Sequence, residues 1–465
     1  MSKNRLALAV IVVITTAMAV VFSLLLLRTT TVAVAAYAVV FGMTMIFVEP
    51  FLGLVNYLIF LYLRPQEFIA GFVGLPVMLI IGSTTFGLML LHMAIRRTSL
   101  GLRRVPQNYL VLWFFAAIAL SHLSHLNMNE AIASVQDFLS VVIMFFLIAV
   151  LIDSNRKLAF TLYLLLVMTL FLAVQGIYQS ITGVGFAGQE LFQNRIVSIG
   201  IFSDPNDLAL ALLVVLPFAV LAGLSARTLF LKVLLFAVAI TIAVTVFITE
   251  SRGGILSLGL LVLILFARRY GWRRGAIAGV VMAFLIFVLG PSRMGTVSTE
   301  EASAAARVAS WTVAIDLFVS YPLFGVGAHM FTSYHPKTAH NSLLLCASEL
   351  GAVGLFAWLM LFLISFKNLR FIAKEAAEKG QPALALYADA VYLGIVAFFS
   401  GSMFLSRSYN EVLFVLFALS SAVTSLFVGQ VPEQYVLIEK RDYLHNLVFM
   451  IGSILVLKAF LIWAW

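Results

Sequence analysis

Hydrophobic residues along this chain form long uninterrupted runs that short polar segments separate. Most runs hold about 20 residues, the length that an α-helix needs to cross a hydrocarbon layer about 30 Å thick. The approximate limits of the runs are 6–27, 31–48, 51–63, 72–95, 109–126, 131–152, 158–181, 208–224, 229–249, 253–267, 275–290, 342–365, 384–404, 411–430 and 444–464. The short run 51–63 fits a broken span or a re-entrant pair with its neighbour. The pattern therefore predicts an all-α polytopic membrane protein with about 12–15 transmembrane helices in one integral membrane domain, residues 1–465.

The overall composition supports this prediction. Hydrophobic residues make up 63% of the chain and charged residues 11%, against roughly 45–50% and about 25% in ordinary globular proteins. A soluble enzyme, a disordered chain and a disulfide scaffold are therefore excluded. The single cysteine, Cys346, can form neither an internal disulfide nor a CxxC metal site. The first run has no small-residue cleavage signal, so we interpret it as a retained span.

The distribution of basic residues predicts the orientation of the chain. With a cytoplasmic N-terminus and alternating spans, 20 of the 29 Lys and Arg residues fall in inner loops, as the positive-inside rule expects. The net charge of +9 is thereby explained by topology and contacts with membrane lipids, and no nucleic-acid partner is expected. The nine others are Arg28, Arg64, Arg195, Arg252, Arg293, Arg307, Lys337, Arg407 and Lys458. Seven of these nine are arginines, whose fork of donors suits a phosphate ligand at the outer interface. The alternative for each arginine is a contact with lipid phosphate.

Two outer loops carry most of the extramembrane sequence, 182–207 and the longer 291–341. Long loops in compact proteins are usually functional. Within the second loop, apolar residues at spacings of three and four predict a helix at about 302–320, too short and polar to span, which we expect to lie at the membrane interface. His340 follows, beside the first turn of the span 342–365.

Two motifs in this outer region have ordinary structural explanations beside functional ones. Ser251-Arg252-Gly253-Gly254 would give the following helix a free N-terminus that favours phosphate, but a tight turn explains the glycines equally well. Asp204 before Pro205 fits a helix N-cap better than a metal ligand. Since no clustered metal-binding motif appears, we expect neither a metal nor another cofactor.

The order of several short motifs resembles the O-antigen ligase superfamily, which includes O-antigen ligases, O-antigen polymerases of the Wzy type and some protein O-oligosaccharyltransferases. The resemblance covers roughly 160–430. The motifs that carry it are Arg195, Gly200-Ile201-Phe202-Ser203-Asp204-Pro205-Asn206-Asp207, Ser251-Arg252-Gly253-Gly254, Arg307 with Trp311, Pro322-Leu323-Phe324-Gly325-Val326-Gly327, and His340-Asn341-Ser342-Leu343. Leu63-Arg64-Pro65-Gln66-Glu67 and Phe404-Leu405-Ser406-Arg407 resemble the ligase branch.

This resemblance implies a glycosyltransferase of GT-C type in the bacterial cell inner membrane, with its active site facing the periplasm. The implied reaction is a metal-independent inverting transfer of a glycan such as O-antigen from undecaprenyl diphosphate to lipid A–core. The family's catalytic histidine corresponds to His340, and its diphosphate-binding arginines to Arg195 with one or more of Arg252, Arg307 and Arg293. Further candidate site residues are Asn341, Asp204, Asn206, Arg407 and His335.

The residue types suit such chemistry, although alternatives remain. A neutral histidine can take a proton from an acceptor hydroxyl near neutral pH, and His335 is the rival base to His340. A polymerase is the alternative within the superfamily, but one outer loop dominates here, which favours a ligase. A transporter of lipid-linked glycans is disfavoured because the spans hold few central charges and no internal repeat.

Overall fold

The computed structural model describes residues 49–68, 76–96, 104–277, 279, 297–432 and 435–464. Helices occupy most of these ranges, and β-structure within them is limited to two isolated bridges in the loop 184–195. The predicted spans 6–27 and 31–48, most of 275–290, and Arg293 lie outside the described residues.

The chain divides into two compact units, residues 1–99 and 100–465. In the first unit, α3 (Pro50–Leu63) packs against α5 (Val77–Arg96), and the short α4 (Pro65–Phe68) follows Arg64. The short apolar run 51–63 is thus a 14-residue helix that begins at Pro50. The single integral domain over 1–465 stays a prediction.

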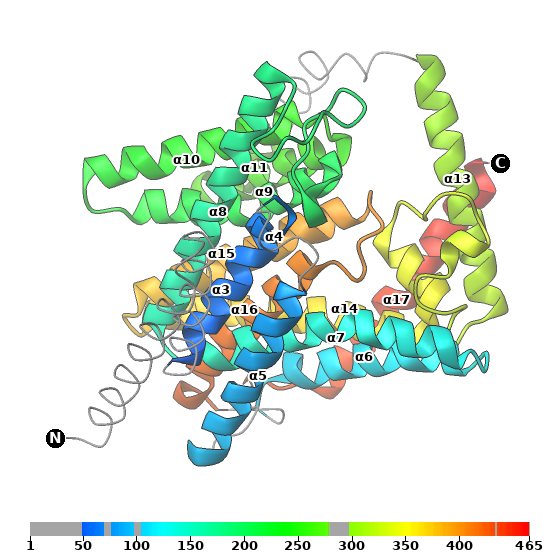
Figure 1. Cartoon of the computed structure of the whole chain (residues 1–465), viewed down its shortest axis with the longest axis horizontal. Coiled ribbons are helices and arrows are strands. Elements are labelled where there is room, and N and C mark those ends of the chain that lie inside the picture. The colour runs from blue at the N-terminus through cyan, green and yellow to red at the C-terminus, as the bar shows by residue number, and fades with distance from the viewer. Residues whose placement is uncertain are drawn as a thin grey trace, which may run out of the picture. The chain divides into compact units, whose positions relative to one another are not determined.

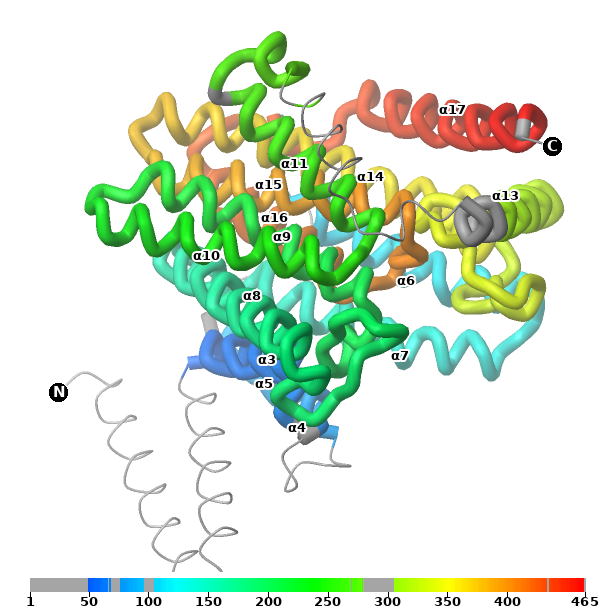
Figure 2. Tube along the Cα trace, turned by 90° about the horizontal axis from the view of Figure 1, so that it is seen from above, coloured from blue at the N-terminus to red at the C-terminus, as the bar shows by residue number. Residues whose placement is uncertain are grey.

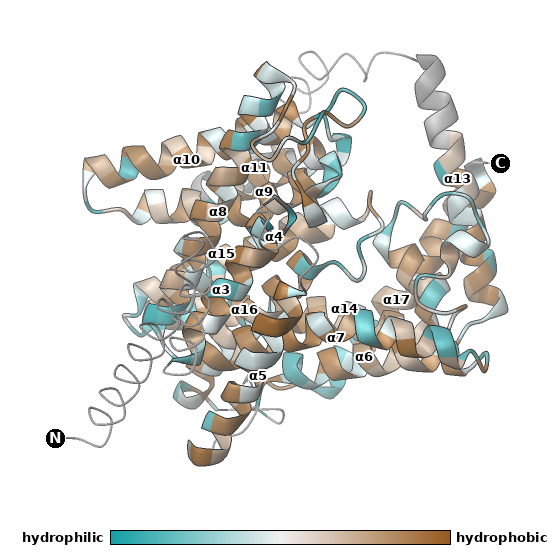
Figure 3. Cartoon of the chain, viewed as in Figure 1, coloured by the Kyte–Doolittle hydropathy of each residue, from teal (hydrophilic) through white to brown (hydrophobic). Residues whose placement is uncertain are grey.

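The second unit holds the remaining helices (Figure 1). They are α6 (Pro106–Leu123), α7 (Met128–Leu151), α8 (Asn155–Thr182), η1 (Gly200–Phe202), α9 (Pro205–Ser225), α10 (Leu229–Ile248), α11 (Arg252–Tyr270), α13 (Val297–Ser320), η3 (Phe331–Ser333), α14 (Ser342–Glu378), α15 (Pro382–Ser402), α16 (Glu411–Phe427), η4 (Val428–Gln430) and α17 (Lys440–Ala464). Nine helices in the described ranges are long and apolar enough to cross a membrane, and apolar residues dominate them (Figure 3). The predicted class, an all-α polytopic membrane protein, is confirmed.

Several of these helices begin at a side chain that caps the backbone. Asp204, Ser251, Asn341 and Asn410 precede α9, α11, α14 and α16, and each side chain accepts a hydrogen bond from a backbone N–H of the first turn. Short polar side chains are favoured at this position because the first N–H groups of a helix have no intrahelical partner. The predicted capping role of Asp204 therefore holds.

Helix α14 packs against α6, α13, α15, α16 and α17 (Figure 2). It continues to Glu378, well past the limit of the predicted span 342–365. The added residues include strong helix formers, and no glycine or proline interrupts them before Gly380. Lys367 and Lys374 consequently lie on a helix, where an inner loop was expected.

A break divides α14 at Gly351, whose φ of 62° and ψ of −162° are not helical. The loop 322–327 fills the break. Val326 N donates to Ser348 O at 3.0 Å, and Ala352 N donates to Pro322 O at 2.8 Å. The loop thereby satisfies backbone groups that the break leaves without helical partners. The first turns of α14 are held as a separate, fixed piece.

Candidate active site

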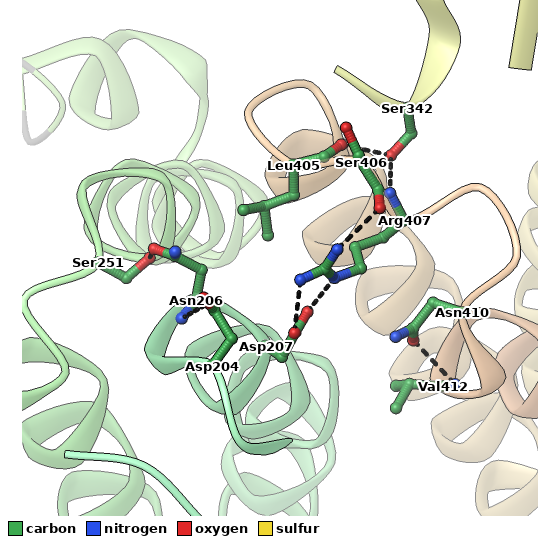
Figure 4. Close-up of polar contacts among 10 residues, drawn as sticks. All are labelled: Asp204, Asn206, Asp207, Ser251, Ser342, Leu405, Ser406, Arg407, Asn410 and Val412. Carbon is green, nitrogen blue, oxygen red and sulfur yellow. Dashed lines mark hydrogen bonds and ion pairs between the residues drawn. The ribbon is translucent and has the colours of Figure 1, made fainter. Parts of the chain in front are cut away.

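Arg195 lies in the connection between α8 and α9, before η1. Its Nε donates to the backbone oxygen of Thr249 at 2.8 Å, and its Nη2 donates to Asn206 Oδ1 at 3.2 Å. Ser251 Oγ donates to the same Asn206 oxygen at 2.8 Å (Figure 4). The amide of Asn206 therefore joins Arg195 to the N-cap of α11, where Arg252 begins the helix.

An ion pair links α9 to the connection between α15 and α16. The guanidinium of Arg407 faces the carboxylate of Asp207 with two nitrogens, Nε toward Oδ1 and Nη2 toward Oδ2, the second pair at 2.6 Å (Figure 4). The side chains are 28% and 11% exposed, so the pair is mostly shielded from water. Burial alone would lower the pKa of Arg407, but the hydrogen bonds and charge of Asp207 raise it above its ordinary value.

The same connection, residues 403–410, holds the start of α14. Ser342 Oγ accepts from Arg407 N at 2.8 Å and donates to Leu405 O at 2.6 Å (Figure 4). His340 N donates to Ser406 Oγ at 2.8 Å. Asn341 caps α14 with its Oδ1 and donates from its Nδ2 to Met403 O at 3.1 Å. This hydrogen-bond network fixes the backbone on both sides of His340.

His340 lies in a cationic environment. Burial, followed by the charges of Arg307, Lys337 and Arg407, lowers the pKa of its imidazole below the ordinary 6.5, and Asp204 opposes the shift. Both effects favour the neutral imidazole, in which one ring nitrogen carries no proton, over the charged form. A neutral histidine among cationic side chains is suited to accept a proton beside a negatively charged ligand.

Arg307 belongs to α13, which contains the predicted helix 302–320 and begins at Val297. Burial and the nearby charge of Arg252 lower the pKa of Arg307. Two guanidinium groups from α11 and α13 therefore lie within electrostatic reach of each other. A negatively charged ligand bound between Arg252 and Arg307 would offset the electrostatic repulsion between their two positive charges.

Tyr409, at the other end of the 403–410 connection, contacts α14 just before the break at Gly351. Tyr409 Oη donates to Glu349 Oε2 at 2.8 Å, and Phe331 N donates to Glu349 Oε1 at 3.0 Å. Glu349 is 2% exposed. It therefore serves to join α14, the 321–341 loop and the 403–410 connection.

Comparison with protein-family models gives a match over this region. Residues 236–359 match the family model described as O-antigen ligase. This stretch of the chain is therefore similar to the O-antigen ligase family. A comparison with curated proteins gives no match. The resemblance predicted from the motifs is thereby confirmed for this stretch, which includes Arg252, Arg307 and His340.

The O-antigen ligase family match ends before the connection 403–410 and begins after Arg195. The structure nevertheless brings several predicted site residues from outside the match next to residues within it. Arg195 contacts Thr249 at the end of α10, and Asn206 contacts Ser251 at the start of α11. Asp204 and Arg407 lie near His340. Arg293 lies outside the described residues. The chemical roles of all these residues stay predictions.

His335, the rival base, is engaged locally. Its Nδ1 lies 2.9 Å from Lys337 O and 3.5 Å from Ser310 Oγ of α13. No cluster of three or more His, Cys, Asp or Glu side chains suited to a metal occurs in the described ranges. Asp204 and Asp207 are occupied as a helix cap and as the partner of Arg407.

Two residues with clear structural roles were not predicted from the sequence. Asp207 was considered only with the helix start, and Ser406 only as part of a motif. Asp207 and Arg407 are 200 positions apart, and no local pattern indicates that they pair. Their opposite charges were the one signal in the sequence, because Asp207 and Arg407 both lie at the ends of apolar runs on the same predicted side of the membrane.

Proposed function

We propose that the protein is a glycosyltransferase that moves a polysaccharide such as O-antigen from undecaprenyl diphosphate to lipid A–core. The reaction takes place at the periplasmic face of the bacterial inner membrane and requires no metal. The observation that carries this proposal is a half-buried His340 within electrostatic reach of Arg307, Lys337 and Arg407, in a stretch that matches the O-antigen ligase family. Such a site pairs a proton acceptor with charges that suit a diphosphate.

The proposed transfer is one inverting displacement. The acceptor hydroxyl oxygen bonds to the anomeric carbon while the bond from that carbon to the diphosphate oxygen breaks. His340 takes the hydroxyl proton, and the electron pair of the broken bond leaves with the diphosphate. Arg195, Arg252 and Arg307 stabilise the charge of the departing group, since guanidinium groups bind phosphate oxygens with two donors.

The hydrogen bonds among the candidate residues support a division of roles. Arg195 and Arg252 belong to the side held by Asn206 and Ser251, and His340 to the side held by Ser406. The ion pair of Arg407 with Asp207 joins the two sides. We therefore assign Arg407 to positioning: it keeps the base at a fixed distance from the donor.

The test is reconstitution of purified protein with an undecaprenyl-diphosphate glycan and lipid A–core, with product size read on a gel. A ligase shifts lipid A–core by one donor chain. Repeated addition of donor units to one another would instead identify a polymerase, and a labelled protein band an oligosaccharyltransferase. The reaction should persist in EDTA. Loss of activity in EDTA with recovery in Mn²⁺ would overturn the metal-independent mechanism.

A further inference from the structure

The loop after α8 begins with a small hairpin whose apex carries no charge. Val184 and Glu190 form an antiparallel bridge, and Gly185 N donates to Gln189 O at 2.8 Å. Between them lie only glycine, phenylalanine and alanine, at 185–188. Gln179 of α8 is fully buried and donates to the backbone oxygens of Gln189 and Glu190 at 3.1 and 3.2 Å, which fixes the hairpin against the helix.

The hairpin folds back along α8. The ring of Phe186 lies 4.9 Å from that of Tyr178 and 5.7 Å from that of Phe171, between ring centroids. At 1.5 Å per residue, Tyr178 is about 6 Å and Phe171 about 16 Å from the helix end at Thr182. Phe186 therefore lies one to three helical turns back from the end of α8, beside the helix and not beyond it.

The face of α8 that Phe186 covers is the exposed apolar one. Its members recur every three or four residues: Phe160, Tyr163, Val167, Phe171, Val174, Tyr178 and Ile181, all more than 36% exposed. α8 is one of the candidate membrane spans, and its other faces pack against α9 and α10. An apolar stripe on the outside of a membrane span faces lipid. Phe186, 51% exposed, extends this stripe.

We propose that the hairpin 183–190 inserts its apex into the lipid bilayer at the boundary between hydrocarbon and headgroups. α8 is roughly 42 Å long at 28 residues, longer than a hydrocarbon layer of about 30 Å. A ring one to three turns from its end lies close to that boundary, where aromatic side chains concentrate. The partner of this surface is therefore the membrane lipid.

This insertion fixes the depth of the chain that follows. Gln179 also accepts from Val197 N at 2.8 Å, so the segment with Arg195 is tied to the same turn of α8 as the hairpin. The hairpin therefore holds Arg195 at the depth of the lipid phosphate headgroups. The diphosphate of a lipid-linked donor would lie at the same depth, a consequence that rests on the proposed function.

The experiment places a fluorophore on the apex. Phe186→Cys, in a background with Cys346→Ser, is labelled with bimane and reconstituted into phosphatidylcholine liposomes with or without nitroxide-labelled acyl chains. We expect the nitroxide lipid to remove most of the fluorescence and aqueous iodide to have little effect. The matched control is Thr332→Cys, an exposed polar position in the 321–341 loop, where iodide should quench and the nitroxide lipid should not.

Quenching of the Phe186 label by iodide and not by lipid would overturn the proposal, and would leave the apex as a water-facing surface for a glycan or a protein. The readout needs no donor or acceptor. Failure of the proposed transferase activity would therefore leave this result unchanged, and the reverse also holds.

Discussion

At the scale of single residues, His340 has an unusual backbone conformation. Its φ of 50° lies in the left-handed region that residues with a side chain rarely adopt. The hydrogen bond from its N–H to Ser406 Oγ and the cap formed by the next residue, Asn341, hold this conformation. Strain of this kind persists only where surrounding structure imposes it, and it clusters at functional sites. The backbone at His340 is thus held by a turn 66 residues away.

His340 and Arg195 should fail in different ways when mutated. A general base contributes roughly 10²–10⁴-fold to rate, so His340→Ala should lower turnover by that order and leave donor affinity largely intact. Arg195→Ala should weaken donor affinity as well as turnover. Arg195→Lys should restore part of the loss, because lysine keeps the charge but lacks the bidentate fork. Donor affinity and initial rate of each purified variant are the measurements.

The opposite pattern would reassign the site. If His340→Ala abolished donor binding and Arg195→Ala left it unchanged, His340 would be a phosphate ligand and His335 the next candidate base. Thermal unfolding of each variant controls for loss of the fold.

The pH dependence of kcat/KM for the donor reports the environment of His340 in the free protein. Because burial and positive neighbours lower the pKa of His340, the base should stay neutral, and kcat/KM should stay high, down to a pH below 6.5. Protonation should remove activity at lower pH. Arg307→Gln removes a positive charge that lowers this pKa, so its acidic limb should move to higher pH. Arg273→Gln, in the chain after α11, is the control and should not move it. If the acidic limb of Arg307→Gln did not shift, the charge of Arg307 would have no influence on the pKa of His340.

At the scale of elements, the break in α14 depends on a glycine. The conformation of Gly351 lies in a region that is essentially restricted to glycine. An added Cβ would also lie 2.4 Å from the carbonyl carbon of Leu323. The loop 322–327 and the break therefore fit each other only without a side chain at this position.

Gly351→Ala should accordingly destabilise the protein, by strain of order 1–3 kcal/mol in addition to the clash. The control is Gly452→Ala in α17, where a Cβ meets nothing within 4 Å and alanine is the better helix former. The measurement is the thermal unfolding midpoint in detergent. A midpoint for Gly351→Ala as high as that of the control would show that the break and the loop do not depend on each other.

The ion pair of Asp207 and Arg407 should act as a unit. Asp207→Asn and Arg407→Gln each leave a mostly shielded charge without its partner, so the double variant should be less destabilised than the two single variants added together, with a coupling of about 0.5–3 kcal/mol. Unfolding free energies of the four proteins give the coupling. As a positioning residue, Arg407 should affect turnover more than donor affinity. Loss of donor binding in Arg407→Gln with unchanged stability would make Arg407 a diphosphate ligand instead.

Elements differ in how well the sequence predicts them. Runs of about 20 apolar residues predict membrane helices because the bilayer imposes their length, and a cap such as Asp204 follows from local hydrogen bonding. The break at Gly351 does not follow, since its neighbours all read as helix and only the loop 322–327 stabilises it. The pairing of Asp207 with Arg407 does not follow from the sequence either, because it depends on which helix ends lie next to each other in the folded chain.

At the scale of the whole molecule, the candidate site and a group of basic residues lie at opposite ends of the same helices. α11 begins at Arg252 and carries Arg268 near its other end, where Arg268 pairs with Asp389 of α15 at 2.8 Å. α14 begins beside His340 and carries Lys367 and Lys374 beyond its break. Since the positive-inside rule places such basic ends in the cytoplasm, we expect the site to face the opposite side.

Cysteine labelling tests this orientation. In a Cys346→Ser background, Thr332→Cys lies in the 321–341 loop and Trp272→Cys just after α11, and both positions are exposed. An impermeant maleimide added to spheroplasts should label Thr332→Cys at once and Trp272→Cys only after the inner membrane is permeabilised. The reverse order would invert every helix of this unit together. His340 and the arginines would then face the cytoplasm, and a periplasmic transfer reaction at this site would be impossible.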